Sequence, residues 1–214
     1  MKNKPHLVIS RYNEDISWVD DLISHNFNVF IYNKGSKLNT PNNDKLNVIE
    51  IENIGRESHT YLYHIKNNYD SLPEKIIFTQ AHPDDHVSEN FKSEFLHFSN
   101  SEESFRYFSK NILEMSILED GVEESGILNG SFWRNRHSLS SCCVTVPKNL
   151  ISNIEDKEWK FGTGAIFGVD RKSILSRGIE FYLDCIEVLN NSSDLINPPE
   201  GHAFERSWYL IFNQ

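Results

Sequence analysis

The segment Thr79-Gln80-Ala81-His82-Pro83-Asp84-Asp85-His86 gathers side chains suited to metal binding. If the proline holds the chain extended, Asp84 and His86 point to one side and Asp85 to the other. A divalent cation could then bind a carboxylate and an imidazole two residues apart. Carboxylates favour Mg²⁺ or Mn²⁺, and an imidazole shifts the preference towards Mn²⁺ or Zn²⁺. The alternative is a turn in which Asp84 or Asp85 caps a helix starting near Ser88.

Part of this segment, Ala81-His82-Pro83-Asp84-Asp85, matches the opening motif of zinc-dependent sugar N-deacetylases. In that family the motif follows the first strand, and a His-x-x-His ligand pair comes later. Here the motif follows the fourth apolar run, and none of the nine histidines forms such a pair. A zinc-dependent sugar N-deacetylase is therefore an alternative function and not the first choice.

A second cluster, Gly55-Arg56-Glu57, precedes a predicted helix. The free N–H groups and the dipole of a helix N-terminus favour an anion, and Arg56 could add a bidentate contact to a phosphate. The alternative is a glycine turn in which Arg56 pairs with Glu57 or another nearby acid.

A third cluster lies near the end of the chain. On a helix, Glu205 falls one turn after His202, and Trp208 falls one turn after Glu205. A carboxylate would then lie beside an imidazole and an aromatic platform suited to a sugar ring. The alternative gives Glu200 a role at the helix dipole and buries Trp208 in the core.

Strands and helices alternate in the first half of the predicted fold. Short runs rich in β-branched and aromatic residues predict strands at 7–9, 28–32, 48–51 and 75–79, with a helix over 58–69. This order predicts a mainly parallel central sheet covered on both faces, a single-domain three-layer α/β sandwich of the Rossmann type over residues 1–214.

Polar residues follow all four strand runs. Ligands bind outside the carboxyl ends of the strands in such sheets, so these residues should converge on one edge. They are Arg11, Asn13, Glu14 and Asp15 after the first run, Asn33, Lys34 and Gly35 after the second, Asn53, Gly55, Arg56 and Glu57 after the third, and Gln80, His82, Asp84, Asp85 and His86 after the fourth.

The second half of the chain begins with a predicted insertion over 88–140. Phenylalanines spaced by three or four predict two amphipathic helices between 89 and 119. Residues 125–141 lack periodicity and carry Trp133 and two arginines, a composition that suits a binding loop. Further strands are predicted at 143–146 and 165–169, and helices at 172–189 and 200–212.

The composition limits the partners of the protein. A formal net charge of −10 argues against nucleic acid or an anionic membrane as principal partner. No apolar run approaches the ~20 residues that span a bilayer, and three cysteines without metal-ligand spacing favour a reduced compartment. We therefore expect a cytoplasmic protein.

Several ordered motifs resemble the DUF3431 family, which is similar in turn to GT-A glycosyltransferases. They are Arg11-Tyr12-Asn13-Glu14-Asp15, Tyr32-Asn33-Lys34-Gly35, Asn53-Ile54-Gly55-Arg56-Glu57 and Phe78-Thr79-Gln80 with His82-Pro83 and Asp85-His86. By this resemblance Tyr12-Asn13-Glu14 contacts a nucleotide, Asp84-Asp85-His86 stands at the place of a metal-binding Asp-x-Asp, and Glu205 stands at the place of a catalytic base. The strict Asp-x-Asp is missing here, and Asn33-Lys34 replaces the acidic residue usual after the second strand.

The resemblance implies a metal-dependent glycosyltransferase that moves a sugar from a nucleotide diphosphate donor to a hydroxyl acceptor, such as a glycan. Mn²⁺ or Mg²⁺, bound by Asp84, Asp85, His86 and His202, would bridge the diphosphate, and Glu205 or Glu200 would be the base. The predicted binding residues are Arg11, Asn13, Glu14, Asn33, Lys34, Arg56, Gln80, Trp133 and Trp208. A non-catalytic module that binds a sugar or nucleotide on the same fold is the alternative from another class.

Overall fold

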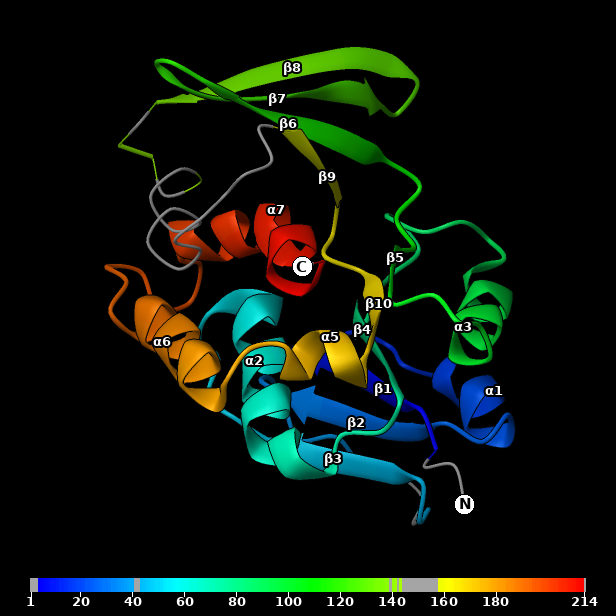
Figure 1. The fold of residues 1–214 in the computed structure, drawn as a ribbon. Helices are drawn as coiled ribbons and strands as arrows, with labels where there is room; N and C mark the ends of the chain where they lie inside the picture. Colours follow the sequence, from blue (N-terminus) through cyan, green and yellow to red (C-terminus); the bar gives the residue numbers. More distant parts are fainter. Residues whose placement is uncertain (1–3, 41–42, 139, 142, 144–157, 214) are drawn as a thin grey trace.

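The computed structural model describes residues 4–40, 43–138, 140–141, 143 and 158–213, and its centre is a mixed six-stranded sheet (Figure 1). The strands, in spatial order, are β3 (Leu46–Glu50), β2 (Asn28–Asn33), β1 (His6–Arg11), β4 (Lys75–Gln80), β10 (Phe167–Asp170) and β5 (Phe105–Tyr107). β3, β2, β1 and β4 are parallel, whereas β10 is antiparallel to both of its neighbours. The four predicted N-terminal strands are thus confirmed.

Two hydrophobic cores flank this sheet. Val8 and Phe78 point into one core with α2 (Arg56–Asn68), α5 (Arg171–Leu175), α6 (Ile179–Asn190) and α7 (Pro199–Phe212). Leu7 and Ile77 point into the other with α1 (Val19–Ser24) and α3 (Phe91–Ser99). Because β1 and β4 are buried on both faces, their sequences are almost continuously apolar. A 3₁₀ turn, η1 (Tyr69–Ser71), follows α2.

A second sheet lies above α7 in Figure 1. It is antiparallel, with the order β8 (Ser131–Ser138), β7 (Gly121–Leu128), β6 (Ile112–Leu118) and β9 (Glu158–Gly162). Its Leu113, Met115 and Val122 share the core of α2 and α7. The indole of Trp159 on β9 donates to the Arg206 carbonyl of α7 at 2.7 Å, which fixes this sheet to the helix.

The second sheet corrects the predicted helical and loop insertion over 88–140. Among the described residues of this range only α3 is an α-helix, and the expected binding loop over 125–141 is largely the β7–β8 hairpin. In β6, Leu113 and Met115 are buried while Ile112 and Glu114 are exposed, the period of two that a half-buried strand requires. Asn129 and Gly130 have φ of +49° and +82°, as a two-residue hairpin turn demands.

Other predictions need smaller changes. The helix predicted over 172–189 is broken into α5 and α6, since residues 176–178 are not helical. The strand predicted at 165–169 is β10, starting at Phe167, and the last predicted helix is confirmed as α7. Of the strand predicted at 143–146, residues 144–146 lie outside the described residues.

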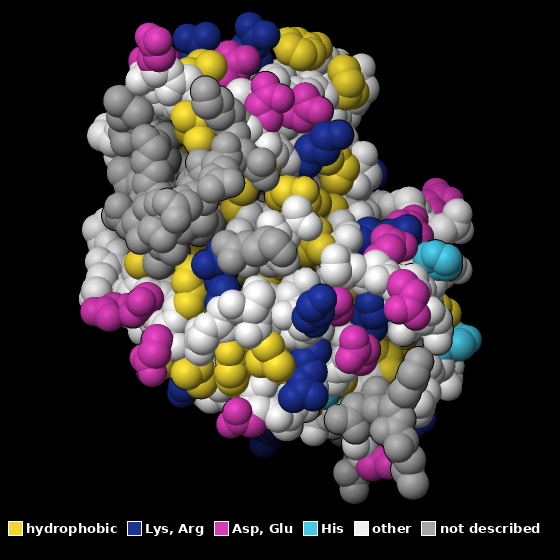
Figure 2. Space-filling model, viewed as in Figure 1, with side chains coloured by type: hydrophobic (Ala, Val, Ile, Leu, Met, Phe, Trp, Pro, Cys, Tyr) yellow, Lys and Arg dark blue, Asp and Glu magenta, His cyan; other side chains and the backbone are white. Residues whose placement is uncertain are grey.

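On the face drawn in Figure 2, acidic and basic side chains lie interspersed with small groups of hydrophobic side chains. Exposed hydrophobic side chains include Ile127 and Phe132 of the β7–β8 hairpin, where the Arg134 guanidinium lies over the Phe132 ring. Among the described residues, no helix has the length and apolar character that crossing a membrane requires.

Candidate functional site

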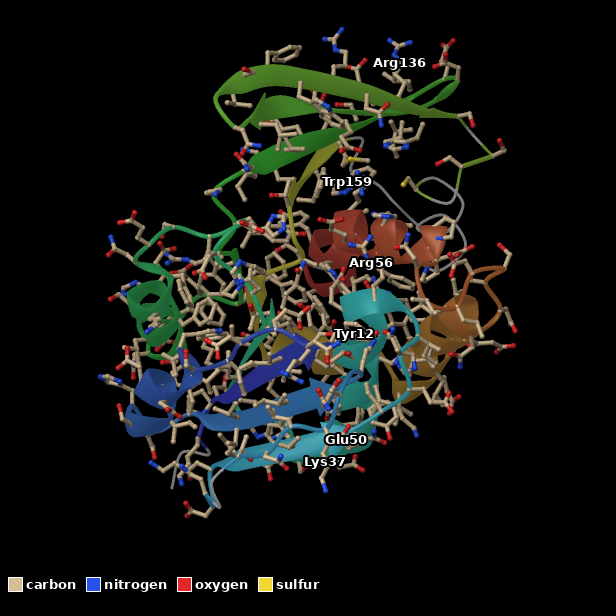
Figure 3. The ribbon with its side chains drawn as sticks, turned by 180° about the vertical axis from the view of Figure 1, so that it is seen from behind. Tyr12, Lys37, Glu50, Arg56, Arg136 and Trp159 are labelled. Atoms are coloured by element: carbon tan, nitrogen blue, oxygen red, sulfur yellow. The ribbon has the colours of Figure 1, made fainter. Side chains whose placement is uncertain are left out.

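A polar pocket of about 180 Å³ opens at the carboxyl ends of β1 and β4. The strand order reverses here, because the chain goes from β1 to β2 on one side and returns to β4 on the other. Such switch points are the usual ligand sites of open α/β sheets. The lining residues are Ser10, Arg11, Tyr12, Glu14, Lys34, Asn53, Arg56, Glu57, Gln80, Ala81 and His82. Tyr12 and Arg56 are seen together in Figure 3, apart from Arg136 on the second sheet.

Arg11, at the end of β1, organises two loops. Its Nη1 donates to Asn33 Oδ1 at 2.5 Å, and its Nε donates to the Glu14 carbonyl at 2.9 Å. Asn33 in turn donates to the Ser36 carbonyl at 2.9 Å and to the Glu50 carboxylate at 2.8 Å. Arg11 therefore fixes the loops after β1 and β2 and lends its charge to the pocket.

The loop after β1 is also held by its own polar side chains. The Glu14 carboxylate accepts the backbone N–H groups of Tyr12 at 2.7 Å and Asn13 at 3.1 Å. Asn13 Oδ1 accepts the N–H of Ser36 at 2.8 Å. Glu14 lines the pocket, whereas Asn13 and Asn33 do not line it and hold its loops through their hydrogen bonds.

Lys34 is buried beside the start of α2. Its ammonium donates to the Ile54 carbonyl at 2.6 Å and to the Arg56 carbonyl. Burial lowers the pKa of Lys34 to about 8, although the charge of Glu57 favours the protonated form. The ammonium group thus braces the turn that precedes α2 and adds a positive charge to the pocket wall.

The N-terminus of α2 meets the pocket with an unusual backbone conformation. Gly55 and Arg56 have φ of +65° and +51°, and for Arg56 this is an uncommon conformation. The Arg56 guanidinium donates to the His202 ring at 2.8 Å and lies 3.5 Å from the Glu57 carboxylate. The N-cap residue, Gly55, has no side chain to cap this helix end, so the helix N-terminus and Arg56 together favour an anion.

Two buried carboxyl groups near this corner differ in acidity. Burial raises the pKa of Glu57, and the charge of Glu205 adds to the rise, against the opposing effect of Arg56. Burial also opposes ionisation of Glu205, but hydrogen bonding from His202, the Arg206 charge and the Gly164 N–H outweigh it and lower its pKa. Glu205 is therefore the more acidic member of the pair.

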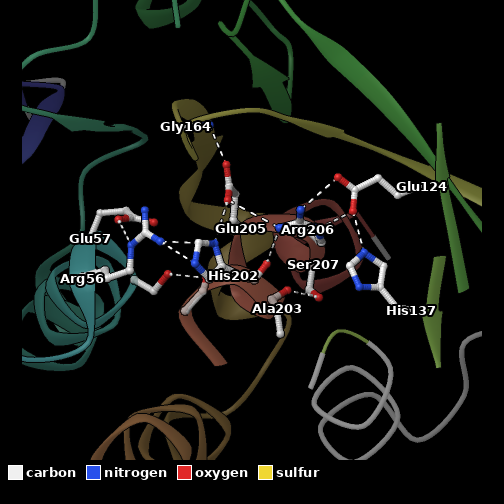
Figure 4. A network of polar contacts seen from close by, with 12 residues as sticks. Arg56, Glu57, Glu124, His137, Gly164, His202, Ala203, Glu205, Arg206 and Ser207 are labelled. Carbon is white, nitrogen blue, oxygen red and sulfur yellow. Dashed lines mark hydrogen bonds and ion pairs between the residues drawn. The ribbon is translucent and has the colours of Figure 1, made fainter. Parts of the chain in front are cut away.

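A chain of hydrogen bonds joins the pocket to α7 (Figure 4). Gln80 donates to the Gly164 carbonyl at 2.7 Å, and the Gly164 N–H donates to Glu205 at 2.6 Å. Gly164 has φ of +84°, and a Cβ there would lie 2.5 Å from the His86 ring. This close approach requires glycine at position 164. Through Gly164, the Glu205 carboxylate is linked to Gln80 at the end of β4.

The same chain continues into the second sheet. Arg206 donates to both carboxylate oxygens of Glu124 on β7, at 2.7 and 2.9 Å, and His137 on β8 lies 2.7 Å from the same carboxylate. Glu124 is almost fully buried. The second sheet thus holds the α7 turn that carries Glu205.

The residues expected to bind a divalent ion do not form one ligand set. Residues 84–86 form a turn, closed by the His86 N–H donating to the Pro83 carbonyl at 2.8 Å, which corrects the expected extended segment. Asp84 and Asp85 are exposed, and the His86 ring packs on Gly164. The His202 ring accepts a hydrogen bond from Arg56. Within the described residues, no group of three or more His, Cys, Asp or Glu side chains is placed to hold a metal.

The aromatic and acidic predictions also change. Trp208 is fully buried in the core, so its expected role as a sugar platform is wrong. Trp133 lies on β8, half-buried, and does not line the pocket. Glu200 lies in the first turn of α7, where one carboxylate oxygen is buried without a partner among the described residues.

The sequence thus predicted where the pocket lies, but it did not predict every residue that lines it. Arg11, Glu14, Lys34, Arg56 and Gln80 were predicted and line it. Asn53, Glu57 and His82 were expected at this edge of the sheet but were not among the predicted binding residues, and Ser10 and Ala81 were not expected to bind a ligand. For Glu57, the position directly after Gly55-Arg56, at a helix start, was the available signal.

Comparison with known proteins gives a family-model match to part of the chain. Residues 7–107 match the family model described as "Protein of unknown function (DUF3431)". The match runs from β1 to β5 and includes every residue that lines the pocket. The match supports the expected resemblance to the DUF3431 family over these residues. No curated protein matches the chain significantly.

Proposed function

We propose that the protein is a glycosyltransferase that binds the diphosphate of a nucleotide sugar in this pocket and transfers the sugar to a hydroxyl acceptor. The observation that carries the proposal is the convergence of Arg56, Lys34 and the uncapped α2 N-terminus at the switch point between β1 and β4. A protein with a net charge of −10 repels anions overall, so a cationic pocket is a local exception.

The arrangement of the strands supports a transferase similar to the GT-A type. The order β3-β2-β1-β4 brings the Tyr12-Asn13-Glu14 loop and the Gly55-Arg56-Glu57 turn to one pocket. The exposed ring of Tyr12 is available to stack on a base at the mouth. The diphosphate would then lie deeper, against Arg56.

The proposed reaction needs a base and a place for negative charge. An acceptor hydroxyl attacks the anomeric carbon of the donor sugar and gives its proton to a carboxylate, for which Glu205 is the first candidate and Glu200 the second. The bond between that carbon and the diphosphate oxygen breaks, and its electron pair goes to the diphosphate. Arg56 and the α2 N-terminus stabilise this leaving group.

The predicted Mn²⁺ or Mg²⁺ site enters the proposal in a limited way. Asp84, Asp85, His86 and His202 do not fit one ion in their present positions, so charge neutralisation is assigned to the cations of the protein itself. Adding Mn²⁺ or a chelator to a binding experiment tests this assignment.

A second candidate is a non-catalytic module that binds the nucleotide sugar without turnover. It is favoured by the engagement of Glu205, whose carboxylate accepts the Gly164 N–H and lies 3.6 Å from Arg206 and 3.8 Å from His202. A carboxylate held by these groups is a weaker base than a free one.

Calorimetric titration with nucleoside diphosphates, with Mn²⁺ and with EDTA, tests the proposal. Binding in either condition supports the pocket assignment, and hydrolysis of a nucleotide sugar separates a transferase from a binding module. Retention of zinc without nucleotide binding would instead favour the deacetylase alternative.

A further inference from the structure

A second cavity, of about 340 Å³, opens where β9 packs against α7. Its volume lies within the range of about 300–1,000 Å³ that is usual for ligand sites. Among the described residues, none lines both this cavity and the polar pocket. The cavity is lined by Glu114 of β6, by Glu158, Trp159 and Lys160 of β9, and by Tyr209 of α7.

The cavity follows the free edge of β9. Of the described strands, only β6 pairs with β9, which is therefore the edge strand of the second sheet on this side. Successive side chains of a strand point to opposite faces, so a cavity lined by the three consecutive residues 158–160 runs along the edge of the strand. The backbone groups that the pairing with β6 leaves open are then available to a ligand.

The side chains of the cavity combine aromatic surface with charges of both signs. Trp159 is buried, and its indole N–H already has a backbone acceptor, so it offers ring surface only. Tyr209 is partly exposed and adds a second ring with a hydroxyl group. The Glu114 carboxylate and the Lys160 ammonium are exposed and lie 3.6 Å apart, and Glu158 adds a second exposed carboxylate.

This combination suits a neutral ligand with hydroxyl groups. The C–H face of a sugar ring packs on an aromatic side chain, and sugar hydroxyls donate to carboxylates and accept from an ammonium or a phenol. Two carboxylates against one ammonium leave the cavity negative, so it repels phosphates. A protein strand fits less well, because β9 offers only five residues for pairing.

We propose that this cavity binds a neutral glycan. In the proposed transfer this glycan is the hydroxyl acceptor; that role rests on the proposed function, whereas glycan binding itself does not. β9 leads from the cavity to Gly164, whose N–H donates to Glu205 at 2.6 Å. Lys160 and Gly164 are four residues apart, at most about 14 Å along the chain. A glycan of several sugar units that is anchored in the cavity can therefore extend towards Glu205.

Glycan binding is measured without nucleotide, first on an array of neutral oligosaccharides and then by calorimetry with the tightest binder. Tyr209→Leu removes an aromatic ring but keeps an apolar side chain, and we expect it to weaken glycan binding about three- to tenfold. Tyr63→Leu is the matched control, because Tyr63 is also partly buried against the same core. Neither this control nor Arg56→Gln, which alters only the polar pocket, should change the glycan affinity.

Glu158→Ala gives a second test that leaves the core intact, because Glu158 is exposed. We expect a similar loss of glycan affinity, with Glu119→Ala in the turn between β6 and β7 as its control. Unfolding temperatures of all variants show whether a loss comes from the fold or from the cavity.

Three results would overturn the glycan site: no neutral oligosaccharide binds, both Tyr209→Leu and Glu158→Ala bind as the wild type does, or a lysine-rich peptide binds more tightly than every glycan. In each case the diphosphate pocket is still judged by its own titration. If the glycan binds with the expected losses but no nucleoside diphosphate binds, the glycan site stands, and the proposed transfer and the acceptor role fail.

Discussion

Arg56 is the residue on which anion binding most depends. It lies at the start of α2 and lines the pocket, and its guanidinium donates a hydrogen bond to the His202 ring of α7. We predict that Arg56→Gln lowers the affinity for a nucleoside diphosphate by about 10- to 100-fold, because a charge-assisted hydrogen bond contributes about 1.5–3 kcal/mol. Calorimetry measures this loss.

The control is Arg134→Gln, which removes an equal charge from the exposed face of β8. If both variants lose affinity equally, the effect comes from net charge and not from the pocket. Unchanged binding by Arg56→Gln would contradict the assigned site.

Lys34 should make anion binding depend on pH. Its pKa of about 8 means that the free protein loses this charge as the pH rises through 8. A bound diphosphate favours the charged form and raises the pKa, so affinity should fall above pH 8 and change little through Lys34 below it. Titrations at pH 7 and pH 9.5 test this, and Lys34→Gln should remove the difference between them. A drop that persists in Lys34→Gln would assign the titration to another group.

At the scale of elements, Glu124 couples the second sheet to α7. It is buried and receives two hydrogen bonds from Arg206. Glu124→Gln removes the hydrogen-bonded carboxylate from the half-buried Arg206 guanidinium, which keeps only Glu205 at 3.6 Å as counter-charge, and we expect it to lower the free energy of unfolding by about 2–3 kcal/mol. Urea denaturation measures the change.

The neighbouring Glu123→Gln is the matched control for this prediction. Glu123 pairs with Arg134 and Arg136, whose side chains are 58% and 62% exposed, so its loss should cost less than about 1 kcal/mol. Equal costs for the two variants would mean that the contact with α7 adds nothing beyond a surface pair.

For the whole molecule, buried histidines should limit stability in acid. Burial lowers the pKa of His6 and of His59 to about 4, and it lowers that of His64 well below its usual value of 6.5. The unfolded chain therefore binds more protons below pH 6.5, and the free energy of unfolding should fall from about pH 6.5 towards pH 4, by up to about 1.4 kcal/mol per pH unit for each group. Denaturation at pH 7 and pH 5 checks the fall, and His59→Gln should make it shallower. A flat profile would contradict neutral buried histidines.

The sequence predicted the strands of the central sheet better than those of the second sheet. β1 and β4 could be found because burial on both faces makes them continuously apolar, and the pocket followed from the residues at their ends. The second sheet was not predicted, because only one of its faces is buried and its strands are therefore not continuously apolar. The spacing of Phe105 and Phe108 also matched the period of a helix, although Phe105 lies on β5. The Asn129-Gly130 turn was the overlooked hairpin signal.

The polar network could not be predicted in the same way. Arg206 and Glu124 are 82 residues apart, and no local pattern links them. The expected role of Trp208 was wrong because helical spacing cannot tell which face of a helix is buried. The metal prediction assumed an extended chain at Asp84, where the backbone turns instead.

The most direct test of the central claim is a crystal structure of the protein soaked with the nucleotide sugar that binds best in calorimetry. We predict that the diphosphate lies beside Arg56 and the first N–H groups of α2, and that the sugar points towards Glu57 and Glu205. Density for the nucleotide elsewhere, for example along the arginines of β8, with the pocket between β1 and β4 left empty, would contradict it.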